Sequence, residues 1–70
     1  MAHQGRIKFY STTRQYGFVI DVETDKEFFF VRGSFNGPLK KGDDVLFDIV
    51  MGKKGPRAVN IIVQERYGND

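Results

Sequence analysis

Short alternating runs of apolar residues dominate this chain, and no stretch shows the sustained spacing of an amphipathic helix. The plainest run is residues 16–21. Read as a strand, it points Tyr16, Phe18 and Ile20 to one side. Gly17, Val19 and Asp21 then point to the other side. The run therefore predicts a strand that displays two aromatic rings on one face, directly after the basic residue Arg14.

A second aromatic run, residues 27–31, follows a short acidic connection. Its rings cannot all face one core, because successive side chains of a strand alternate between the two faces. We expect Phe28 and Phe30 to be buried, with Phe29 and Val31 facing outward beside the rings of the preceding strand.

Five short strands are predicted in all, at residues 5–10, 16–21 or 22, 27–31, 44–51 and 57–63 or 65. Glycine-rich turns separate them, and residues 33–38 form a loop with one helical turn around Ser34 and Phe35. In the first strand, placing Ile7 in the core and both Lys8 and Phe9 on the exposed face requires a bulge or a strong bend.

The expected fold class is all-β, a five-stranded antiparallel barrel of the oligonucleotide/oligosaccharide-binding (OB) type. A chain of 70 residues forms a single domain, and closing the sheet into a barrel removes exposed edges and covers the apolar face. We place the barrel at residues 5–65, with short flexible tails that include His3 and residues 66–70. The core candidates are Phe28, Phe30, Phe47, Ala58, Val59, Ile61 and Ile62, and Tyr10 is expected to be half-buried.

The distribution of charge along the chain says more about a possible ligand than the net charge does. The net charge is only +2. Residues 1–18 carry Arg6, Lys8 and Arg14 and no acid, whereas the acids of residues 21–27 are read as an ordinary solvated stretch. The chain has no cysteine, no signal-peptide pattern and no apolar run near 18 residues, so we expect a protein that stays in the cytoplasm.

The residues offer little for catalysis. The one histidine, His3, falls in a predicted tail, and without cysteine no zinc site is plausible. Residues 11–13 have hydroxyl groups but no nearby base to activate them. We therefore predict no enzyme activity, no catalytic residue, no metal, no cofactor and no small-molecule substrate.

Seven phenylalanines and three tyrosines remain to be explained. Exposed rings beside cations suit single-stranded nucleic acid, since bases stack on aromatic faces and phosphates attract positive charge. The alternative is a small β-barrel interaction module, or a homodimer, in which Tyr16, Phe18 and Phe29 dock a protein. The pattern favours nucleic-acid binding by a monomer and leaves the alternative open.

Four motifs in order resemble those of bacterial cold-shock proteins. Residues 5–11 are similar to the family's Gly-x-Val-Lys-Trp-Phe-Asn, and residues 14–19 to its Lys-Gly-Phe-Gly-Phe-Ile. Residues 28–32 are similar to Val-Phe-Val-His-Phe, and residues 55–61 to Gly-Pro-x-Ala-x-Asn-Val. The resemblance implies an OB-type barrel that binds single-stranded RNA or DNA and acts as an RNA chaperone without ATP, or as a regulator of gene expression.

By position, the resemblance implies stacking on Phe9, Phe18 and Phe29 with Tyr16 alongside. The whole implied nucleic-acid-binding set is Lys8, Phe9, Arg14, Tyr16, Phe18, Glu27, Phe29, Val31, Arg32 and Lys54. Its cations would meet phosphates or base edges, and Glu27 would accept a hydrogen bond from a base.

Several positions depart from the family pattern. Phe9 replaces a tryptophan, Gln15 a glycine, Val31 a histidine and Arg32 an aromatic residue. Val31 is a poorer platform for stacking, whereas an arginine can stack its guanidinium group or pair with a phosphate. The loop after the third β-strand is also shorter than usual. We therefore expect weaker binding that covers fewer nucleotides than in typical members of the family.

Overall fold

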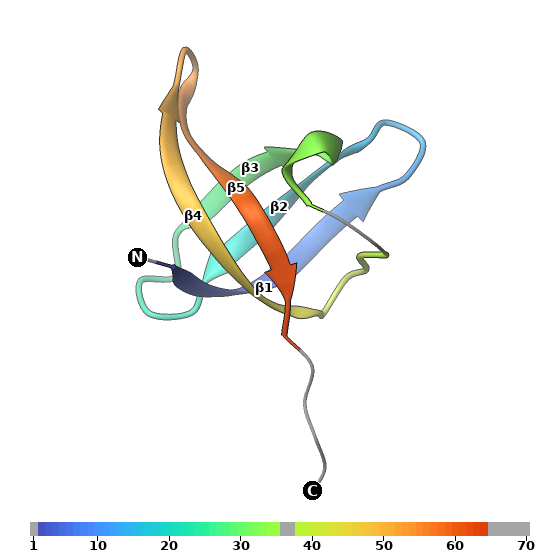
Figure 1. The fold of residues 1–70 in the computed structure, drawn as a ribbon, viewed down its shortest axis with the longest axis horizontal. Helices are drawn as coiled ribbons and strands as arrows, with labels where there is room; N and C mark the ends of the chain where they lie inside the picture. The colour runs from blue at the N-terminus through green and yellow to red at the C-terminus, as the bar shows by residue number, and fades with distance from the viewer. Residues whose placement is uncertain (1, 36–37, 65–70) are drawn as a thin grey trace, which may run out of the picture.

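The computed structural model describes residues 2–35 and 38–64 and consists of five strands around one core (Figure 1). The strands are β1 (His3–Ser11), β2 (Tyr16–Asp21), β3 (Glu27–Val31), β4 (Asp44–Gly52) and β5 (Gly55–Val63). A single turn of 3₁₀ helix, η1 (Arg32–Ser34), follows β3. Strands β2 and β3 match the predicted bounds, and β1, β4 and β5 extend further than predicted.

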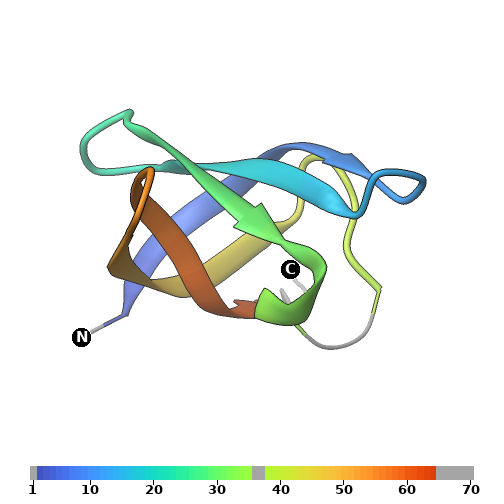
Figure 2. The ribbon, with the colours of Figure 1, turned by 90° about the horizontal axis from the view of Figure 1, so that it is seen from above.

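The strands close into a barrel in the order β1-β2-β3-β5-β4, which confirms the predicted all-β barrel. Seen from above, β2 and β3 cross one side of the barrel while β4 and β5 lie on the other (Figure 2). The prediction of a purely antiparallel barrel was wrong, because β3 and β5 pair in parallel at Phe29 and Arg57. Strand direction cannot alternate all the way round a closed ring with an odd number of strands, so at least one neighbouring pair must be parallel.

The predicted bulge in β1 is present. Ile7 lies opposite Val19 and Phe9 lies opposite Phe18, so Lys8 is an extra residue without a partner on β2. The extra residue breaks the alternation of faces. Ile7 is consequently buried, whereas both Lys8 and Phe9 are exposed.

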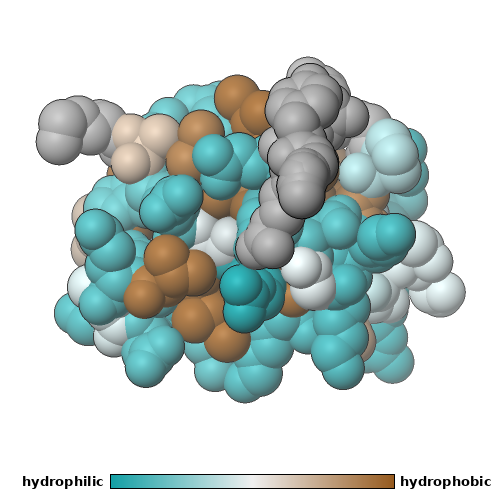
Figure 3. All heavy atoms as spheres, turned by 90° about the horizontal axis from the view of Figure 1, so that it is seen from below, coloured by the Kyte–Doolittle hydropathy of each residue, from teal (hydrophilic) through white to brown (hydrophobic). Residues whose placement is uncertain are grey.

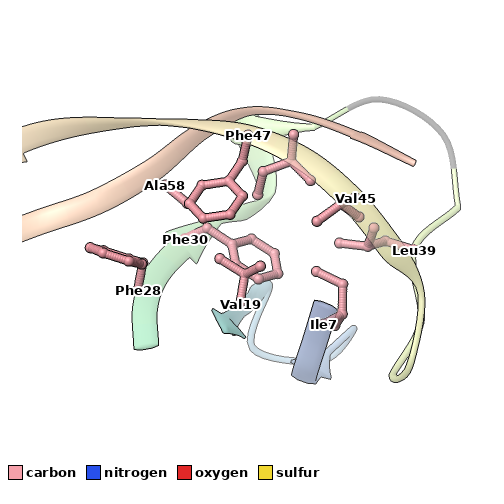
Figure 4. Close-up of a cluster of buried hydrophobic side chains, with 9 residues drawn as sticks. Ile7, Val19, Phe28, Phe30, Leu39, Val45, Phe47 and Ala58 are labelled. Atoms are coloured by element: carbon pink, nitrogen blue, oxygen red, sulfur yellow. The ribbon is translucent and has the colours of Figure 1, made fainter. Parts of the chain in front are cut away.

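The core lies between the two sides of the barrel, where apolar side chains from all five strands and Leu39 point toward one another (Figure 4). Phe28, Phe30 and Phe47 are buried as predicted. Behind Phe30, the half-buried rings of Tyr10 and Phe35 pack at centroid distances of 5.9 and 5.8 Å. Burying rings of this size provides most of the stabilisation of so small a domain.

The last strand differs from its prediction at two positions. Ala58 and Ile61 are buried as expected, but Ile62 is 63% exposed and Val59 is only half-buried. Asn60 has a φ of 52°, and the pairing of β4 with β5 shifts register nearby. This irregularity lets side chains three positions apart, Ala58 and Ile61, both face the core.

The first strand also begins earlier than predicted. His3 belongs to β1 opposite Phe47, and its Nδ1 lies 3.2 Å from Oδ2 of Asp21. Asp21 is only 3% exposed, so reading the whole acidic stretch as solvated was wrong for this residue. Its other oxygen accepts a hydrogen bond from the Glu23 amide, which closes the turn between β2 and β3. Strand alternation explains this burial, since Asp21 shares the inward face of Val19.

The surface is mostly hydrophilic on the face shown in Figure 3, where small apolar patches lie between polar residues. Within the described part of the chain, no helix is long and apolar enough to cross a membrane, and no group of acidic and histidine side chains is arranged to hold a metal ion. The predicted C-terminal tail (66–70), and residues 36–37 of the predicted loop, lie outside the described residues.

Gly17 is a position where the packing requires the absence of a side chain. A Cβ there would overlap the carbonyl oxygen of Phe9 and lie 2.7 Å from Cζ of Phe30. We expect Gly17→Ala to lower the free energy of unfolding by about 1–3 kcal/mol, because an overpacked core must shift its backbone. Gly33→Ala is the control, since a Cβ at Gly33 meets no atom within 4 Å. Equal urea midpoints for the two variants would contradict this account of the packing.

Candidate nucleic-acid interface

Three phenylalanines form a row across β1, β2 and β3 on the outside of the barrel. Phe9 pairs with Phe18, and Phe18 pairs with Phe29, so the three side chains lie side by side on one face. Phe9 is 42% exposed and Phe29 is 38% exposed, while Phe18 is half-buried between them. Rings this open are available to a ligand while their stems remain anchored in the sheet.

Tyr16 connects the row into a cluster of four rings. Its centroid lies 5.8 Å from that of Phe9, 6.0 Å from that of Phe18 and 5.8 Å from that of Phe29. Phe18 and Phe29 are themselves 6.0 Å apart in a T-shaped arrangement. Such tilted contacts are the favoured geometries of aromatic pairs. They hold the rings in place without a ligand, and we call these four side chains the ring cluster.

Local sequence explains why these rings face outward. In β3 the alternation buries Phe28 and Phe30 and exposes Phe29, as predicted. In β1 the bulge at Lys8 turns Phe9 away from the core. Val31 lies opposite Tyr16 in the pairing of β2 with β3, which places it on the same outer face.

One cation and one acid from the predicted set meet at an edge of the ring cluster. Nζ of Lys8 donates to Oε2 of Glu27 at 2.7 Å, joining β1 to β3 across the intervening β2. Both side chains remain about half exposed, at 50% and 46%.

Two other predicted cations, Arg14 and Arg32, lie near the opposite end of β3. The Arg32 amide donates to the carbonyl oxygen of Gln15 at 3.0 Å, so the β1–β2 turn and η1 are tied together there. Gln15 has a φ of 60°, in the left-handed region that favours glycine. This conformation gives the physical reason for the glycine that the resembled motif has at this position.

Lys54 lies in the turn between β4 and β5, beside a groove of about 770 Å³. Phe29 of β3 and residues of the β4–β5 hairpin both line this groove. Met51, Lys53 and Arg57 also line it and were not among the predicted site residues. The missing information was the parallel pairing of Phe29 with Arg57, because no local pattern predicts which distant residue completes a barrel. The basic side chains of the hairpin therefore line the same groove as Phe29, a member of the ring cluster.

The family model for the 'Cold-shock' DNA-binding domain matches residues 3–64. The chain belongs to this family. It is similar to a cold shock-like protein of Aquifex aeolicus, with 37% identity over 90% of this chain and 96% of that protein. Cold shock protein CspB of Bacillus caldolyticus is 33% identical over 84% and 94% of the two chains. Cold shock-like protein CspC of Escherichia coli K12 is 31% identical over 83% and 90%.

Membership confirms the resemblance drawn from the four motifs and agrees with the OB-type barrel. It also supports a cold-shock-like function in nucleic-acid binding for this domain. Which residues make that contact follows from neither the match nor the relatives' names, so the role of each side chain remains a prediction based on geometry.

The opposite faces of β3 give a direct test of this geometry. Phe30→Ala removes a fully buried ring and is expected to lower the free energy of unfolding by about 3–5 kcal/mol. Phe29→Ala removes a ring that is 38% exposed, and we expect a much smaller loss, measured by urea unfolding followed by circular dichroism. If Phe29→Ala destabilised the domain as much as Phe30→Ala, the ring would be a core residue and the proposed face would be wrong.

Proposed function

We propose that this cold-shock domain binds single-stranded RNA or DNA by stacking bases on the ring cluster, and that it acts as an RNA chaperone or as a regulator of gene expression. The observation that supports this best is the set of four mutually packed, partly exposed rings on β1, β2 and β3. A base stacked on an aromatic side chain contributes about 1–3 kcal/mol and needs no particular sequence.

Stacking on this surface would distinguish unpaired from paired strands. A base in a duplex has both faces covered by its neighbours, whereas a base in a single strand can present one face to a ring. Binding would therefore shift RNA toward unpaired conformations by mass action, with the affinity for single strands as its only source of free energy. A chaperone that works this way has no need of ATP.

The proposed binding residues are Lys8, Phe9, Arg14, Tyr16, Phe18, Glu27, Phe29, Val31, Arg32 and Lys54, and we add Arg57 at the groove. Arg14 and Arg32 are exposed near one end of β3, and Lys54 and Arg57 are exposed at the hairpin beside Phe29. A strand crossing the rings would thus find cations for its phosphates on two sides. We propose that the domain binds as a monomer and works in the cytoplasm, where its proposed ligands are found.

The proposal is tested by titrating fluorescently labelled heptathymidylate and following its anisotropy, supported by intrinsic tyrosine fluorescence. We expect saturable binding with a shallow dependence on salt, because stacking outweighs phosphate attraction. Phe18→Ala and Phe29→Ala should each weaken binding by about 5- to 150-fold, corresponding to about 1–3 kcal/mol per lost platform. Ile62→Ala is the control, since this side chain is 63% exposed on β5 and does not belong to the ring cluster.

Two results would contradict the proposal. One is an absence of binding at low salt by a folded protein. The other is equal loss of affinity in the Ile62→Ala control. Sedimentation at increasing concentration then tests the homodimer alternative, because a self-associating surface would yield species larger than the 8.0 kDa monomer.

A further inference from the structure

Lys8, one of the cations of the proposed binding face, already forms an ion pair with Glu27. The carboxylate of Glu27 lies 2.7 Å from the Lys8 ammonium group, within the range of a charge-assisted hydrogen bond. Lys8 is the extra residue of the β1 bulge, and bulges commonly re-aim a side chain. Here the bulge directs the lysine across β2 to an acid on β3.

The two ends of the binding face differ in whether their basic side chains are paired with acids. Glu27 begins β3 and lies opposite Ile20, and this pair is two residues along the strands from the pair of Phe18 and Phe29. Arg6, opposite Ile20 on β1, also has an acidic partner, because its Nε lies 3.2 Å from Oδ1 of Asp44. At this end of the ring cluster, the two basic side chains that β1 contributes, Arg6 and Lys8, therefore each meet a carboxylate.

The other end differs. Among the described residues, neither Arg14 nor Arg32 makes an ion pair with an acid, and both are exposed. A phosphate can approach these arginines without competition. To reach Lys8 it must displace a carboxylate that already holds the ammonium group.

We infer that Glu27 is a specificity-determining residue that acts as an internal substitute for phosphate at Lys8. Resting on the proposed single-strand function, this role makes binding depend on bases rather than on backbone charge. A duplex offers phosphates but no free base faces, so it gains most from an available cation. A single strand gains from the rings whether or not Lys8 is available. The ion pair thereby favours single strands over duplexes.

Glu27→Gln tests this inference, since it removes the charge with little change in size. Lys8 becomes available to phosphate, and each additional phosphate contact steepens the slope of log K against log salt by about 0.9 for duplex DNA and about 0.7 for a single strand. We expect Glu27→Gln to steepen the two salt slopes by these amounts and to raise the affinity for a short labelled duplex several-fold at low salt. The ratio of single-strand to duplex affinity should fall.

Glu23→Gln is the matched control, because it makes the same change in net charge at an exposed turn residue. It should leave the slopes within about 0.2 of the starting protein, well below the effect of one phosphate contact. A second test uses the Lys8→Met background, in which Glu27→Gln should no longer steepen either slope. Urea unfolding of each variant establishes that the comparison is made on folded protein.

The outcomes separate this inference from the proposed function. If the starting protein does not bind heptathymidylate, the proposed function fails. If it binds, but Glu27→Gln and Glu23→Gln change the salt slopes equally, the effect is one of overall charge and the inference is overturned. It is also overturned if Glu27→Gln steepens the slopes equally with and without Lys8.

Discussion

The inward burial of Phe30 is the constraint on which the proposed binding face depends. Its ring is fully buried and packs against Tyr10 and Phe35, and Gly17 leaves the space that it occupies. Shifting β3 by one residue would exchange the inner and outer faces and expose this ring to water. Burial of Phe30 therefore sets the register that presents Phe29 to solvent, beside Tyr16 and Phe18.

Two irregularities adapt the barrel to this face. The bulge at Lys8 turns Phe9 outward, which adds a third ring to the row on β2 and β3. The parallel pairing of β3 with β5 brings Arg57 beside Phe29 and extends the surface into a groove along the β4–β5 hairpin. Both features place additional side chains where a strand that crosses the rings would meet them.

Electrostatics and stacking have different roles on this surface. The net charge is only +2, and two cations near one end of the face, Arg6 and Lys8, each have a carboxylate partner. In the proposed binding mode, these carboxylate partners would reduce the share of phosphate attraction in the binding free energy and leave a larger share to stacking on the rings. Binding that depends on ring faces suits a protein whose proposed ligands are unpaired strands.

The sequence by itself determined the five strands, the inner and outer faces of β2 and β3, and the family, because alternation is local and the four motifs are contiguous. It correctly separated Phe28 and Phe30 from Phe29, and it required the bulge in β1. Tertiary structure decided what depends on contacts between strands: the parallel β3–β5 pair, the burial of Asp21 beside His3, the exposure of Ile62 and the ion pair of Lys8 with Glu27. Local alternation cannot predict these features, because each depends on how a residue sits against strands that are distant in the chain.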